Sequence, residues 1–304
     1  MRLCAFAFAA LLAAGPAVLA NELDDTFASL KEAEAKKDLA LLKKLSAETS
    51  ALAREEIGIA EPSNATDKDT WVKRVAYAKE VEAYSEYALY SAAVQSPAES
   101  AIDLLTALEE QNPTSRYLDE GGYARYFQAL EQSGAGAKVV PLAEKVIKTL
   151  PGCGDALMVL ANNALTKGQN GQALSYAQKL VSSTVKDTKP AAMAQADWDR
   201  KRATLLGRGY WISGMMFASS NNFYEADRNL RAALPYIRGN DAMSGPALFA
   251  LGVANYQLGA QTNNKNRVLE AANFSEQASK IPGGHAQQAY SNTQAMRTAA
   301  AKMR

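Results

Sequence analysis

The segment of residues 154–181 constrains the fold of this chain more than any other stretch. Two runs of apolar and small residues at helical spacing are separated there by a polar turn around Gly168 and Asn170. The inner faces of the two runs consist of Leu157, Leu160, Ala161 and Ala164, followed by Ala173, Ala177 and Leu180. Because alanine lets two helix axes approach to about 8–10 Å, this pattern predicts a hairpin of two closely packed helices.

Similar pairs of runs occur before and after this segment. We expect a long helix at about residues 69–94 that pairs with 98–110, and a helix near 123–130 that pairs with one ending before Pro151. A loop at about 182–190 precedes a helix near 191–217, whose partner contains Ala226 and Leu230. The last pair is expected around residues 248–255 and 271–278. Proline, glycine and asparagine between the runs mark where the helices end.

Residues 22–56 and 287–303, near the two ends of the chain, fit the same all-helical organisation. Residues 22–56 are rich in strong helix formers, and a bend near Lys37 and Asp38 would fold them into a hairpin. The polar run 287–303 fits a capping helix. We therefore divide the chain into a signal peptide (1–20), an N-terminal helical hairpin (21–57), a linker (58–68), a helical array (69–283) and a C-terminal capping helix (284–304).

This succession of hairpins, with a small residue where each second helix meets its partner, resembles the tetratricopeptide repeat family over about residues 84–282. The interval from Val139 to Ala173 is 34 residues, which is the repeat length of that family. The resemblance implies an all-α, helical-hairpin solenoid or superhelix. A non-repetitive all-helical domain is the alternative. In the family, the first helices of successive repeats line a concave groove that binds a peptide or protein.

Carried over position by position, the resemblance implies a partner-binding groove. Its lining would be Glu86, Tyr87, Tyr90, Arg125, Gln128, Met158, Val159, Asn162, Arg208, Trp211, Met215, Phe249, Val253 and Tyr256. Aromatic residues, Met and Arg are enriched where proteins bind proteins, although the same types at helical spacing also form cores. Asn162 matches the asparagine of family members that grip a C-terminal carboxylate, but Met158 replaces their lysine. An extended or helical apolar segment therefore fits the lining better.

The N-terminal residues have the pattern of a secretory signal peptide. Arg2 precedes an apolar run at residues 3–14, and Val18 and Ala20 provide the small residues of a cleavage site after Ala20. The run is short and is interrupted by Gly15 and Pro16, so we expect no transmembrane segment. This pattern predicts a periplasmic or secreted protein.

Charge disfavours nucleic acid as a partner. Without the leader, the chain has 32 Lys and Arg residues and 32 Asp and Glu residues, so it has no net field to attract a polyanion. The bases and acids are mixed along the chain, apart from a mildly basic end after Gln261 that a solvated helical cap explains. We expect a protein or peptide partner and no nucleic acid.

Residues for metal or covalent chemistry are scarce. His285 is the only histidine, and Cys153 is the only cysteine after the leader, so we expect no metal site, no cofactor and no catalytic residue. Adjacent acids such as Glu55 and Glu56 point about 100° apart on a helix and do not converge. The turn at 134–139 lacks the pattern of a phosphate-binding loop.

These observations predict an exported scaffold or adapter without catalysis, acting in cell-envelope assembly or secretion. One alternative is a small-molecule or glycan-binding module that uses Tyr84, Tyr87, Tyr90 and Trp211 as stacking platforms. Another is a hydrolase of envelope glycan that uses two convergent carboxylates from different helices.

Overall fold

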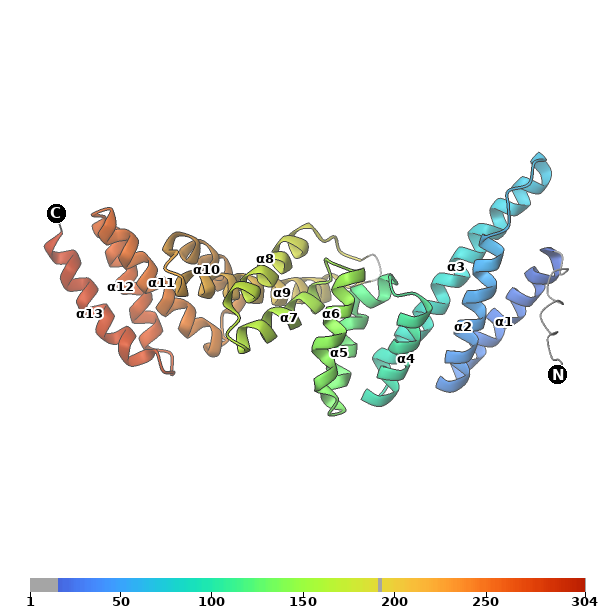
Figure 1. Ribbon diagram of the computed structural model, residues 1–304, viewed down its shortest axis with the longest axis horizontal. Coiled ribbons are helices and arrows are strands. Elements are labelled where there is room, and N and C mark those ends of the chain that lie inside the picture. The colour runs from blue at the N-terminus through green and yellow to red at the C-terminus, as the bar shows by residue number, and fades with distance from the viewer. Residues whose placement is uncertain (1–15, 191–192, 304) are drawn as a thin grey trace, which may run out of the picture. The chain divides into compact units, whose positions relative to one another are not determined.

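Helices form every regular element in the part of the chain that the computed structural model describes, residues 16–190 and 193–303. They form two compact units that are divided between Lys138 and Val139. Within each unit the helices pack in consecutive pairs, so the predicted all-α fold of helical hairpins is confirmed (Figure 1). No described helix is long and apolar enough to cross a membrane.

Unit 1 begins with the predicted N-terminal hairpin. Its elements are α1 (Pro16–Lys36), α2 (Leu39–Ile57), α3 (Ala65–Gln95), α4 (Ala98–Gln111), the π-helical turn η1 (Leu118–Gly122), α5 (Tyr123–Gln132) and the 3-10 turn η2 (Gly136–Lys138). The bend lies where the sequence places it, because Lys37 adopts a φ of 56° and Asp38 caps α2 by accepting a hydrogen bond from the Leu41 amide. The helix expected at 69–94 begins earlier, at Ala65, because Asn64 provides a cap.

Unit 2 contains the segment that most strongly indicated a hairpin. Its helices are α6 (Val139–Thr149), α7 (Gly154–Thr166), α8 (Asn170–Lys186), α9 (Gln195–Ser219), α10 (Phe223–Ile237), α11 (Asp241–Gln261), α12 (Lys265–Ser279) and α13 (Ala286–Lys302). All seven residues expected on the inner faces of the 154–181 hairpin are buried. The alanines of α7 and α8 pack together with Ile212 of α9 in one core cluster.

From α7 onward, the helices of unit 2 form two layers. Helix α9 contacts both α7 and α11, and α11 contacts α13, so these four helices form one continuous layer. Helices α8, α10 and α12 pack against that layer as the second members of their pairs. Figure 1 shows α11, α12 and α13 as consecutive neighbours near the C-terminus. The layer of α7, α9 and α11 therefore contains the first helices on which the groove was expected.

One loop is shorter than the sequence predicts, and the expected leader lies mainly outside the described residues. The loop expected at 182–190 is shorter, because α8 continues to Lys186 and its Thr184 is buried. No glycine or proline interrupts residues 182–186, so nothing ends the helix before Asp187. The expected signal peptide falls mainly on residues 1–15, which lie outside the described residues, as do residues 191 and 192.

Candidate functional site

Four residues connect the three helices of the α7, α9 and α11 layer. Arg208 of α9 donates from Nε to Asn162 Oδ1 of α7 over 2.6 Å. Its guanidinium carbon lies 4.8 Å from the centre of the Trp211 ring. Trp211 in turn donates from Nε1 to the carbonyl of Met243, in the first turn of α11, over 2.8 Å. We call these four residues the Arg208 row.

The guanidinium of Arg208 is partly buried without an opposite charge. Removal from water lowers the pKa of Arg208, and no neighbouring carboxylate offsets that effect. Among the described residues, its only polar partner is the neutral amide of Asn162. A cation that is partly desolvated and has no counterion is uncommon, because burial of an unpaired charge is unfavourable.

The other groove candidates of unit 2 lie beside this row or further along α11. Met158 packs against the cluster of Leu157, Leu180 and Leu205, and Met215 packs against a cluster formed by α10 and α11. Phe249 contacts the His285 ring at 6.5 Å, and Tyr256 packs on the core between α12 and α13. The candidates Met158, Val159, Asn162, Arg208, Trp211, Met215, Phe249, Val253 and Tyr256 are all half-buried. Each therefore combines a packed side with an accessible side.

The candidates of unit 1 are more divided. Glu86 is buried at 7% exposure, and both of its carboxylate oxygens accept hydrogen bonds, from Asn112 Nδ2 and Ser115 Oγ. Arg125 donates to the carbonyl of Ser96, and Gln128 is exposed. Glu86 thus connects α3 to the loop after α4, which is a structural role.

Tyrosines of unit 1 gather into a cluster, which we call the tyrosine patch. It comprises Tyr84, Tyr87, Tyr90 and Tyr117, with ring centroids 5.7 to 6.1 Å apart in successive pairs. Within it, Tyr87 is exposed and Tyr117 is buried. Sequence reasoning missed Tyr117, because it precedes the π-helical turn η1, which has no simple periodic signature. The spacing of Tyr84, Tyr87 and Tyr90 on one helix face was the available signal.

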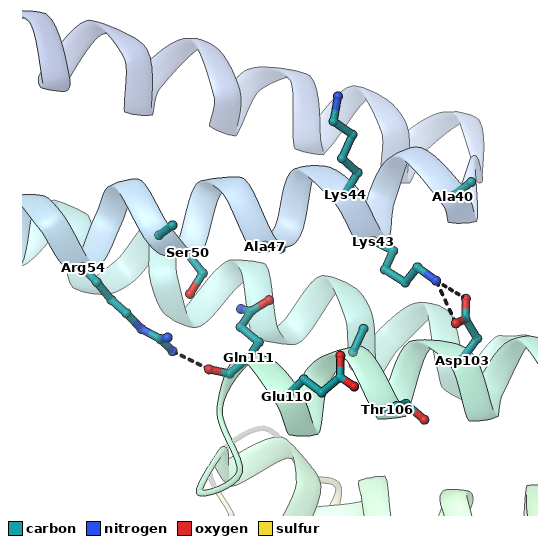
Figure 2. Close-up of a pocket in the computed structure, with 12 residues that line it drawn as sticks. Ala40, Lys43, Lys44, Ala47, Ser50, Arg54, Asp103, Thr106, Glu110 and Gln111 are labelled. Atoms are coloured by element: carbon teal, nitrogen blue, oxygen red, sulfur yellow. Dashed lines mark hydrogen bonds and ion pairs between the residues drawn. The ribbon is translucent and has the colours of Figure 1, made fainter. Parts of the chain in front are cut away.

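A separate groove lies between α2 and α4 on unit 1, and the sequence did not indicate it (Figure 2). It has a volume of about 620 Å³ and a floor that includes Ala47, with basic side chains on α2 and acidic ones on α4. Lys43 Nζ lies 2.7 Å from both carboxylate oxygens of Asp103, and Arg54 donates to the Gln111 carbonyl over 2.9 Å. Lys43 is therefore paired with Asp103 at one edge, and Arg54 also forms an ion pair with Glu82.

Clusters of metal-ligating residues and paired acids are the remaining features that bear on the enzyme alternative. No group of three or more His, Cys, Asp and Glu side chains in residues 16–190 and 193–303 is placed to hold a metal ion. Glu56 forms a two-pronged ion pair with Arg74, at 2.6 and 2.8 Å, so this acid is engaged in the fold. Comparisons with protein-family models and with curated proteins find no match to this chain.

Proposed function

We propose that this chain is an exported, tetratricopeptide-like adapter without catalytic activity, which binds a peptide or protein segment along the face of α7, α9 and α11. The observation that carries the proposal is the burial of the nine unit 2 candidates, which are half-buried while most residues between them on each helix are buried. Leu157, Ala161 and Ile212, for example, are almost fully buried. Aromatic, Met and Arg side chains with one accessible side suit a protein-binding surface.

Site-specific photocrosslinking tests this proposal. Benzoylphenylalanine is placed at Val253 on α11 in the whole chain, so that the leader can direct export, and the protein is irradiated in its native cell envelope. The control carries the same group at Tyr224, which is 63% exposed on α10 in the other layer. We expect a discrete crosslinked partner from Val253 and none from Tyr224. Equal crosslinking from both positions, or none from either, would contradict the proposed face.

Export is a separate part of the proposal and rests on the leader pattern of residues 1–20. Expression of the whole chain followed by N-terminal sequencing of the product outside the cytoplasm tests it. We expect the mature protein to begin at Asn21. A product that keeps Met1 and stays in the cytoplasm would contradict it.

A glycan-binding function is the second candidate, and the tyrosine patch favours it. Partly exposed aromatic rings provide stacking surfaces. Tyr87 is 41% exposed and Tyr84 and Tyr90 are half-buried, whereas Tyr117 is buried beside them. Titration with soluble fragments of envelope glycan, followed by calorimetry, tests this function. Tyr87→Ala should abolish the heat of binding, whereas Tyr236→Ala, at the same 41% exposure on α10, should not change it. No heat with the unaltered chain would exclude it for these glycans.

A further inference from the structure

The strongest unexplained feature of unit 2 is the unpaired charge in the Arg208 row. Two contacts with the same sequence separation connect α7 to α9. Lys201 Nζ lies 2.9 Å from Asp155 Oδ2, and seven residues later Arg208 Nε donates to Asn162 Oδ1. In both cases the partners are 46 residues apart. Because residues seven apart lie within about 20° of each other around a helix, the two contacts occupy the same seam between the helices.

The two contacts differ in charge. At the first position a buried carboxylate, with a side chain 9% exposed, neutralises the lysine. At the second position the acid is replaced by an amide of the same shape, so the arginine keeps its full charge. An aspartate at 162 would complete the pair, and its absence leaves the positive charge available to a ligand.

The two terminal nitrogens of the guanidinium, Nη1 and Nη2, are also without a partner among the described residues. Asn162 accepts its hydrogen bond from Nε instead. Together, Nη1 and Nη2 can hold a carboxylate end-on. Trp211 stacks against the guanidinium, and its own N–H is fixed by the Met243 carbonyl. This arrangement reduces the ordering that binding would otherwise require.

From this geometry, and resting on the proposed function, we infer that Arg208 binds the side-chain carboxylate of an Asp or Glu residue in the segment held on the α7, α9 and α11 face. A single cation matches a monoanion better than a phosphate, because the neighbouring Lys201 is already paired with Asp155. Arg208 lies on the middle helix of the three, with Asn162 on one side and Met243 on the other. A segment crossing this row continues past Arg208, which favours a side chain over a chain end.

Selection from a displayed library of random dodecapeptides tests this inference. The bait is the chain without residues 1–20, either unaltered or as Arg208→Gln. We expect the unaltered bait to enrich peptides with an acidic residue at one fixed position among apolar residues. The Arg208→Gln bait should keep the apolar pattern and lose the acid. The control Arg228→Gln, an exposed arginine of α10, should select the same peptides as the unaltered bait.

The outcomes separate the two proposals. If neither bait enriches peptides, the proposed function fails. If both baits enrich apolar peptides with no fixed acid, the proposed binding face is supported and the proposed role of Arg208 is wrong. If the fixed anion is a terminal carboxylate, then amidation of the peptide end removes binding, and the side-chain assignment is wrong.

A second variant keeps the inference testable if Arg208→Gln fails to fold. Asn162→Asp gives Arg208 an ion pair like the one between Lys201 and Asp155. This variant should therefore have a higher Tm, and its new carboxylate should occupy the Arg208 guanidinium. We expect affinity for a selected peptide to fall roughly 10- to 100-fold in calorimetry, as for loss of a charged hydrogen bond. Changing the peptide's Glu to Gln should produce a similar loss with the unaltered chain and little further loss with Asn162→Asp. Unchanged affinity in a folded Asn162→Asp protein would overturn the inference.

Discussion

Tyr84 connects α3 to α1 in unit 1 and makes the stability of the fold sensitive to high pH. Its phenol is half-buried between α3 and α1 and donates a hydrogen bond to Glu34 Oε2. Burial, and then the hydrogen bond with this carboxylate, raise the pKa of Tyr84 to about 12. The folded state therefore favours the protonated phenol more than the unfolded state does.

We expect a loss of stability that begins near the ordinary tyrosine pKa of about 10 and is complete above the raised pKa of about 12. The sign follows because the unfolded chain releases the Tyr84 proton first as pH rises. Urea unfolding at a series of pH values above about 9 measures this loss in the free energy of unfolding. Tyr84→Phe should flatten the pH dependence, and an identical slope in both proteins would contradict the assignment.

Glu86 supports a second prediction at the scale of single residues. Replacement by Ala leaves the Asn112 amide and the Ser115 hydroxyl without their acceptor. We expect a loss of about 1–3 kcal/mol in the free energy of unfolding. The matched control is Glu80→Ala, at an exposed position on the same helix, which should change stability by less than about 0.5 kcal/mol. Chemical denaturation measures both.

Individual helices approach closely where glycine replaces a side chain. On α9, a Cβ added to Gly214 would lie 2.5 Å from Leu230 Cγ and 3.0 Å from the Leu230 backbone nitrogen on α10. On α11, a Cβ at Gly252 would meet Ser275 Oγ and the carbonyl of Ala271. These contacts set the spacing within two successive hairpins, because the backbone on the opposite helix cannot easily move away.

Gly214→Ala should therefore destabilise the protein by about 1–3 kcal/mol, although alanine is the better helix former. Gly171→Ala provides the control, because no atom lies within 4 Å of the added Cβ in the first part of α8. There we expect no loss and a gain of up to about 1 kcal/mol. Thermal unfolding of both variants measures the contrast, and equal shifts would show that α9 and α10 can separate without penalty.

The sequence was most informative where local pattern and packing agree. The hairpin of α7 and α8 could be predicted because Ala161, Ala164 and Ala173 carry helical periodicity and small size together. The end of α8 could not, since Ser182 and Thr184 suit a loop as well as a helix and only packing decides between them. Tyr117 was missed because its ring meets Tyr87 and Tyr90 across a loop.

For the candidate site, a repeat position alone could nominate Arg208 but could not describe its surroundings. The lack of a counterion depends on which residue of α7 faces it, and that is known only once the register of α7 against α9 is fixed. Glu86 illustrates the opposite case, because its repeat position suggested a groove and its hydrogen bonds place it in the fold.

At the scale of the molecule, the division between Lys138 and Val139 has a testable consequence. Core clusters of unit 2, such as that of Leu157, Leu180 and Leu205, draw only on residues within that unit. We expect residues 139–303 to fold without unit 1 and to bind the selected peptides with the affinity of the whole chain. Circular dichroism, cooperative melting and calorimetry check this. A fragment that is helical but melts without a transition would contradict it.

In unit 2, the main contacts of each helix are with helices one or two places away along the chain. Tension applied to the two ends of such an array is resisted locally, since these main contacts join near neighbours along the chain. Under the force of an optical trap, unit 2 should lengthen in several hairpin-sized steps. It would therefore yield gradually to load and re-form from whichever hairpin remains.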